Sequence, residues 1–161
     1  MNAVFKNFIR IQGAIFLLMA ASLLIPLFLA FYYDEDSCKF AFLLVSGSCA
    51  LAGIIIRLGV KPADAKFKVR DGFLIVSTAW LVCSVIGALP FLISGTISSA
   101  ADAFFESCSG FSTTGASILT DVEVLPKSIM FWRSFTHWLG GMGIIVFVMA
   151  LMPVLGINGQ I

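Results

Sequence analysis

Residues 112–117 combine side chains and backbone that could bind a cation stripped of its water. The run Ser-Thr-Thr-Gly-Ala-Ser carries four hydroxyl groups, one glycine and no charge. Backbone carbonyls and neutral hydroxyls can replace an ion's hydration shell. Gly115 permits the positive φ that turns successive carbonyls toward one axis. Because Ca²⁺ and Mg²⁺ sites normally recruit carboxylates, this oxygen chemistry favours a monovalent cation.

The chain around this run has the composition of a membrane protein. It is 60% hydrophobic and 12% charged, with a mean hydropathy of +1.04. Irregular backbone exposed to lipid would leave N–H and C=O groups unpaired. The polar stretch at 104–120 is therefore predicted to be enclosed in protein or to line a water-filled path.

The sequence offers no constellation for catalysis and no cofactor site. It has a single histidine, no nucleophile–base pair and no phosphate-binding loop, so we predict that the protein is not an enzyme. Four cysteines show no metal-ligand spacing and are interpreted as small, reduced core residues: Cys38, Cys49, Cys83 and Cys108. The basic segment at 61–70 is interpreted as a topology determinant that contacts lipid headgroups, and no nucleic acid partner is expected.

Four apolar blocks predict membrane-spanning helices, at 11–33, 40–60, 72–97 and 129–155. Each approaches the ~20 residues that cross a bilayer core. The first block is too long for the apolar region of a signal peptide, so a retained span is predicted. Pro26 and Pro90 fall inside blocks and indicate kinks rather than helix ends.

A shorter helix is predicted at about 99–110, with Ser98 or Ser99 as its cap. Its length of roughly 16 Å covers half a bilayer, so the chain must return through a loop at 111–120. We therefore predict an all-α membrane protein with two parts. Residues 1–70 form a pair of transmembrane helices with a basic cytoplasmic loop, and 71–161 form one helix–pore helix–filter loop–helix repeat.

Charge predicts the orientation of the chain. One side carries seven basic residues, and the other is largely acidic. The positive-inside rule then makes this a multi-pass cell-membrane protein with a cytoplasmic N-terminus. The basic residues are Lys6, Arg10, Arg57, Lys61, Lys66, Lys68 and Arg70.

Three stretches of the sequence are characteristic: FFESCSGFSTTGAS, FWRSFTHWLGGMGIIVFVMALMPVLG and the earlier GVKPADAKFKVRDGFLIV. With them the chain resembles the Trk/Ktr/HKT superfamily of potassium transporters, and most closely its TrkH-type branch. In that family four covalently linked repeats surround one pore, and each filter segment has one key glycine. The resemblance implies that Gly115 is the filter glycine of the first repeat, with Thr113, Thr114 and Ala116 beside it.

The resemblance also implies a function and partners. It implies K⁺ uptake, with K⁺ held at Thr113, Thr114 and Gly115. It further implies a homodimer of full-length chains and a cytoplasmic ring of nucleotide-binding regulatory subunits. One repeat would expose its polar loop to lipid, so either the chain is the N-terminal part of a longer transporter or four copies assemble; we expect the former.

Several residues near the loop have two interpretations. Glu106 either attracts cations at the vestibule or ties the short helix to the loop or to Arg133. Ser112 is assigned to the same supporting group. Arg133 and His137 are interpreted as interfacial anchors beside Trp132 and Trp138, with a pH-sensing histidine as the alternative. Three further acidic residues are interpreted as solvated: Asp102, Asp121 and Glu123. Three glycines are interpreted as sites of close helix packing, with a hinge as the alternative: Gly140, Gly141 and Gly143.

Two other functions stay open at this point. The chain could be a non-conducting structural membrane subunit whose polar loop only packs against a partner. It could also form a less selective pathway for Na⁺ and K⁺. In the family, serine in place of the first filter glycine is associated with Na⁺-permeable plant members, so Gly115 favours K⁺.

Overall fold

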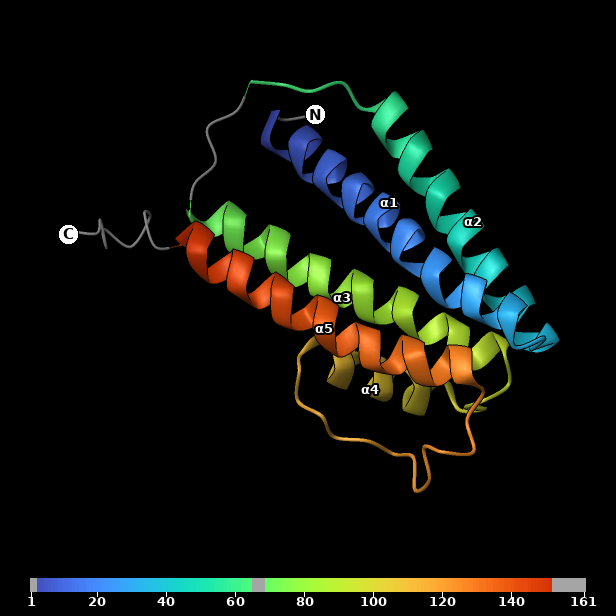
Figure 1. Ribbon diagram of the computed structural model, residues 1–161. Helices are drawn as coiled ribbons and strands as arrows, with labels where there is room; N and C mark the ends of the chain where they lie inside the picture. The colour runs from blue at the N-terminus through green and yellow to red at the C-terminus, as the bar shows by residue number, and fades with distance from the viewer. Residues whose placement is uncertain (1–2, 65–68, 152–161) are drawn as a thin grey trace.

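The computed structural model describes residues 3–64 and 69–151, which contain five α-helices and no strands. These are α1 (Ala3–Tyr32), α2 (Asp36–Gly59), α3 (Val69–Ile93), α4 (Ala100–Phe111) and α5 (Lys127–Leu151). Helices α1 and α2 form an antiparallel hairpin, and α3 and α5 run beside each other (Figure 1). The short α4 packs against α3 and α5 on the side away from the hairpin (Figure 1). The all-α prediction is thus confirmed for the described residues.

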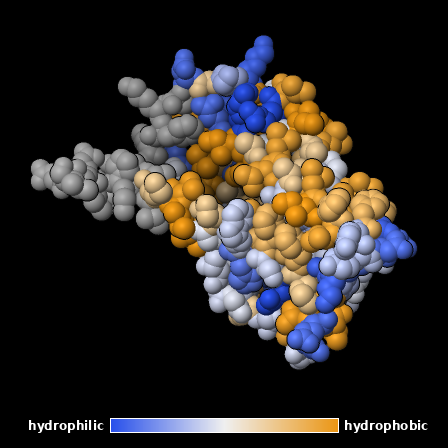
Figure 2. All heavy atoms as spheres, viewed as in Figure 1, coloured by the Kyte–Doolittle hydropathy of each residue, from blue (hydrophilic) through white to orange (hydrophobic). Residues whose placement is uncertain are grey.

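Among the described residues, α1, α2 and α3 contain segments long and apolar enough to cross a membrane. The fourth predicted span corresponds to α5, and its last residues, 152–155, lie outside the described residues. Large apolar side chains cover much of the face seen in Figure 2, with hydrophilic residues toward its upper and lower margins. Such a surface suits lipid. Large apolar side chains more than half exposed include Leu18, Phe28, Phe40, Leu51 and Leu58.

Several helix bounds differ from the predicted ones, and two of the differences have a visible cause. The first helix begins at Ala3 rather than at residue 11, because its polar start is bound by the connection that follows α2. Asn7 Nδ2 donates to the Ala63 carbonyl at 2.6 Å, and an Arg10 guanidinium N–H donates to the Val60 carbonyl at 3.0 Å. Helix α3 ends at Ile93 rather than at 97, since the chain turns at Gly95 with φ +75°. Both Pro26 and Pro90 lie inside helices, as predicted.

Trp132 joins the hairpin to the rest of the helices. Its side chain is completely buried, it meets the Phe42 ring edge-on, and its Nε1 donates to the Gly87 carbonyl at 3.0 Å. The prediction that Trp132 is an interfacial anchor is therefore wrong. The cysteine prediction is also wrong in part: Cys38 and Cys49 are buried, but Cys108 is exposed on α4.

The turn between α1 and α2 also contacts α5. Asp34 adopts the left-handed backbone conformation, with φ +58°, which aspartate tolerates better than most residues. Lys39 pairs with Asp34 and Asp36, and its hydrogen bond lowers the pKa of the Asp34 carboxyl group. Glu35 occupies the N-cap position of α2, yet its side chain makes no hydrogen bond there. It extends instead to the first residues of α5.

Candidate functional site

Helix α4 runs back along α3 and ends near the middle of its two neighbours. Ser99 caps its start, where Ser99 Oγ accepts from the Asp102 N–H at 3.4 Å, so the capping prediction holds for Ser99. At the other end, Trp80 Nε1 donates to the Phe111 carbonyl at 3.0 Å. Trp80 lies near the midpoint of α3 (Val69–Ile93). The polar loop at 112–126 therefore begins about halfway along the long helices.

The end of α4 is fixed by close contact with α5. A Cβ added to Gly140 would lie 2.1 Å from the Phe111 carbonyl oxygen, a backbone atom that cannot rotate away. A Cβ on Gly141 would come no closer than 3.8 Å to any atom, at Thr113. The close-packing interpretation therefore holds for Gly140 and not for Gly141.

The loop after α4 has an unusual backbone. Thr113 has φ +56° and Gly115 has φ +78°, whereas Thr114 between them does not have a positive φ. Positive φ at alternate residues is a backbone pattern that permits successive carbonyls to face the same side. Glycine adopts the left-handed region at little cost, but a β-branched threonine there is strained. The Thr113 and Thr114 N–H groups stay tied to α4, donating to the carbonyls of Gly110 at 2.9 Å and Ser109 at 3.0 Å.

The four predicted ion ligands differ in their surroundings. All are exposed in the described chain, so none is committed to core packing. The Ala116 carbonyl accepts a hydrogen bond from Ser109 Oγ at 2.6 Å and thus interacts with α4. The Thr114 hydroxyl lies 2.7 Å from that of Ser112. The geometry leaves the carbonyls of Thr113, Thr114 and Gly115 as the stronger candidates.

Glu106 binds both the loop and α5. Its side chain is 1% exposed and Arg133's is 19% exposed, and Arg133 Nε donates to Glu106 Oε1 at 2.5 Å. Ser117 Oγ lies 3.0 Å from both carboxylate oxygens, and the Ile118 N–H donates to Oε2 at 3.1 Å. A buried charge needs such partners. Of the two interpretations of Glu106, the geometry favours the tie between short helix, loop and Arg133.

The remaining candidates lie at the edge of the site. Nδ1 of His137 is 2.9 Å from the Arg133 carbonyl oxygen, within the same helix. Asp102, Asp121 and Glu123 are exposed, consistent with the prediction of solvated acidic residues. Arg133 is not an interfacial anchor, because its guanidinium is used by Glu106.

The sequence interpretation missed Ser109, Ser117 and Trp80 as supports of the loop. Ser109 holds the Ala116 carbonyl, Ser117 contacts Glu106, and Trp80 binds the end of α4. One signal was present. Polar residues spaced along a short apolar helix, as at Glu106 and Ser109, need partners once they are buried.

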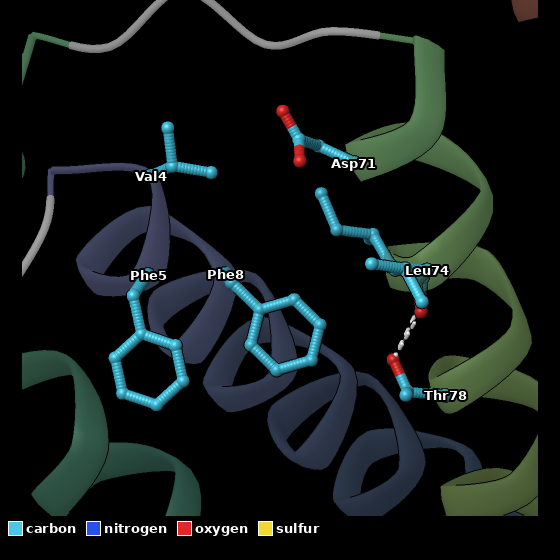
Figure 3. A pocket seen from close by; sticks show the side chains of 7 residues that line it. Val4, Phe5, Phe8, Asp71, Leu74 and Thr78 are labelled. Atoms are coloured by element: carbon cyan, nitrogen blue, oxygen red, sulfur yellow. Dashed lines mark hydrogen bonds between the residues drawn. The ribbon is translucent and has the colours of Figure 1, made fainter.

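A separate cavity of about 350 Å³ lies between the start of α1 and the first turns of α3, away from the loop (Figure 3). Its walls are apolar apart from Asp71 and Thr78. Thr78 Oγ1 donates to the Leu74 carbonyl at 2.7 Å, so its hydroxyl is used within its own helix. None of its lining residues belongs to the loop at 112–126.

Within residues 3–64 and 69–151, no group of three His, Cys, Asp or Glu side chains is placed to hold a metal ion. The loop after α4 carries neutral hydroxyls and carbonyls, and the Glu106–Arg133 ion pair lies behind it. Long apolar helices and a polar loop starting at their midpoint define an α-helical membrane protein.

Comparisons with known proteins identify its family. Residues 45–161 match the family model TrkH, described as a cation transport protein. The chain therefore belongs to the TrkH cation transport family.

Relatives of known name agree. The Trk system potassium uptake protein TrkH of Vibrio parahaemolyticus is 40% identical over 97% of this chain and 32% of the relative. TrkH of Escherichia coli K12 is 38% identical, again over 97% of this chain and 32% of the relative. An uncharacterised cation transporter of Methanocaldococcus jannaschii is 36% identical over 88% of this chain and 29% of that relative. The chain thus spans about a third of the length of these relatives.

A solved structure has the same arrangement of helices. The crystal structure of the potassium transporter TrkH from Vibrio parahaemolyticus matches with a TM-score of 0.87 at 40% identity. The match covers 98% of this chain and 34% of that one.

Proposed function

We propose that this chain supplies one of four filter segments in a pore for K⁺ uptake. Residues 71–161 act as the first pore repeat, with α4 as pore helix and the loop that follows it as filter. K⁺ is bound by the carbonyls of Thr113, Thr114 and Gly115. Ala116 belongs to the filter segment, while Glu106, Ser112 and Arg133 support it.

The observation that carries this proposal is the backbone of the loop. Positive φ at Thr113 and Gly115, in an exposed segment, supports a loop whose carbonyls face one side, and rings of carbonyls are how proteins replace an ion's hydration shell. Strained backbone at a braced position supports a functional role. The C-terminal end of α4, which is partially negative, points toward the same region and favours a cation.

One segment cannot enclose a pore, so three further filter segments are part of the proposal. A loop exposed on one chain would meet lipid if nothing covered it. Relatives named as potassium uptake proteins support K⁺ as the ion. Resemblance to the family further supports a homodimer of full-length chains and a nucleotide-binding ring on the cytoplasmic side.

A matched pair of glycine substitutions tests the proposal in the natural full-length protein. Gly115→Ala and Gly95→Ala both place a side chain at positive φ, +78° and +75°, with no atom within 4 Å of the new Cβ. Each costs roughly 1–2 kcal/mol of backbone strain. In cells deficient in K⁺ uptake, Gly115→Ala should abolish growth on low K⁺ and uptake of Rb⁺, while Gly95→Ala should retain both.

Equal Rb⁺ uptake per molecule by the two variants would refute the filter role of Gly115 and favour a non-conducting membrane subunit. Reversal potentials in mixed Na⁺ and K⁺ separate the selective pore from a less selective one. Gly115→Ser should shift them toward Na⁺. A wild-type protein that already passes both ions equally would contradict K⁺ selectivity.

A further inference from the structure

We infer that Glu35 is a positioning residue for the loop at 112–120, acting through α5. Glu35 lies between α1 and α2, about 80 residues before the loop in the sequence, yet it is bound to the start of α5. The inference extends the proposed function by assigning the hairpin of α1 and α2 a part in holding the filter.

The contact itself is a helix cap supplied by a distant part of the chain. Glu35 Oε1 accepts from the Lys127 N–H at 2.6 Å, and Oε2 accepts from the Ser128 N–H at 3.2 Å and from the Ser128 hydroxyl. The first N–H groups of a helix lack partners within it, and a negative charge there is favoured by the helix dipole. Ser128 is completely buried, so its N–H and hydroxyl have no water to replace the carboxylate, whereas Lys127 is exposed.

The neighbouring charges do not compete for this carboxylate. Lys39 pairs with Asp34 and Asp36, on either side of Glu35. The left-handed backbone of Asp34 reverses the chain at this point. The carboxylate of Glu35 is thereby left to the N-terminus of α5.

From Ser128 the contact is transmitted to the loop in two steps. One and a half helical turns further along α5, Arg133 Nε binds Glu106 at 2.5 Å. Glu106 in turn accepts from the Ile118 N–H at 3.1 Å and contacts Ser117. Since a helix is stiff over so short a length, a shift at its first residues moves Arg133 relative to Glu106. Glu35 therefore fixes the position of Arg133, and with it the position of the Glu106 carboxylate that binds the loop.

Glu35→Gln is the variant that tests this. In either orientation of the amide, its NH₂ group faces a backbone N–H donor, because each carboxylate oxygen accepts from one. Asp36→Asn is the matched control, since it removes a carboxylate one residue away whose hydrogen bond goes to Lys39. Ser128→Ala is the milder variant, removing one of the three hydrogen bonds and keeping the two from the backbone.

The first measurement does not depend on transport. Hydrogen exchange of the full-length protein in lipid nanodiscs should quicken roughly tenfold at 127–128 in Glu35→Gln, as expected for loss of a charged hydrogen bond. It should also quicken by a factor of about 2 or more at 117–119, the signature of coupling rather than local damage. Ser128→Ala should give the same pattern with smaller changes, and Asp36→Asn should change neither segment. Faster exchange confined to 127–128 would overturn the inference.

The second measurement reads the consequence for ions. The apparent KM for Rb⁺ should rise by about twofold or more in Glu35→Gln, and Na⁺ should compete more strongly, at an unchanged amount of protein in the membrane. A lower amount of protein with unchanged KM and selectivity would mean a purely structural role and would overturn the inference. If Gly115→Ala transports normally, the proposed function fails, and exchange at 117–119 still decides the role of Glu35.

Discussion

Thr113 is the residue whose conformation departs furthest from what its side chain prefers. A β-branched residue at φ +56° carries strain on the order of 1–3 kcal/mol. Surrounding contacts must hold it there, and they are visible: its N–H is bound by the Gly110 carbonyl, and Glu106 binds the Ile118 N–H further along the loop. Residues 113–118 are thus held at both ends by hydrogen bonds to α4.

The ion pair of Glu106 and Arg133 should behave as a unit. Glu106→Gln leaves a largely buried guanidinium without its charge partner, and Arg133→Met leaves a buried carboxylate. Each should lower the free energy of unfolding by roughly 2–3 kcal/mol, a value reduced for the partial exposure of Arg133. The loss is measured as a lower unfolding temperature in detergent. The double variant should lose less than the sum, with a coupling of roughly 1–3 kcal/mol. Purely additive losses would show that the two side chains act independently.

At the scale of elements, α4 and α5 are joined by a backbone contact that only glycine permits. The Phe111 carbonyl lies against Gly140 and also accepts the indole N–H of Trp80. Three helices therefore converge on one peptide group at the start of the loop. The position of this peptide sets where the loop begins.

A single methyl group should test that contact. Gly140→Ala should destabilise the protein by about 1–3 kcal/mol, since the clash at 2.1 Å involves backbone and cannot be relieved by a rotamer change. Gly141→Ala is the control in the same helix, and its new methyl finds nothing closer than 3.8 Å. It should be neutral or stabilising by up to about 1 kcal/mol through helix propensity. Thermal unfolding followed in detergent compares them, and equal losses would contradict the role of the contact.

Periodic and compositional features of the chain predicted most of the helices. Apolar length located the membrane-spanning segments, and Ser99 with the acidic first turn located the start of α4. Local signals failed where partners are distant in sequence. Trp132, an apparent interfacial residue, is buried because its N–H meets Gly87, and Glu35 caps a helix that begins more than 90 residues later. Such pairings depend on which helices pack together, which no local pattern records.

The backbone conformation of the loop was predicted at Gly115 and not at Thr113. Gly115 was expected to have positive φ, and it does. Positive φ at Thr113 was not expected, because threonine disfavours it. The hydrogen bond from Ser109 to the Ala116 carbonyl was also not foreseeable, since it depends on how the loop folds back over α4.

At the scale of the whole molecule, the start of the chain and the connection after α2 lie at one shared end. The start of α1 and the connection after α2 are hydrogen-bonded to each other through Asn7 and Ala63. Basic residues predicted to be cytoplasmic, such as Arg10 and Lys61, therefore lie at this shared end. The turn at Asp34 and the start of α5 lie together at the other end.

Reporter fusions should reveal this orientation in living cells. Alkaline phosphatase, which is active only outside the cytoplasm, should be inactive when fused at 62–64 and active when fused within 121–124. A fluorescent protein that matures in the cytoplasm should give the reverse pattern at the same two places. Activity of the phosphatase at 62–64 would contradict a cytoplasmic N-terminus, because Asn7 and Ala63 are held on one side.

The exposed thiol of Cys108 gives the protein a built-in reporter of assembly. Cys38 and Cys49 are buried and Cys83 is partly covered, so among the described cysteines Cys108 is the most open to a maleimide. It lies on the face of α4 that neither α3 nor α5 covers. If other filter segments close around a shared pore, that face becomes enclosed and labelling slows. The rate at which the Cys108 thiol is alkylated, measured on the native protein, thus reports how completely the other segments enclose the pore.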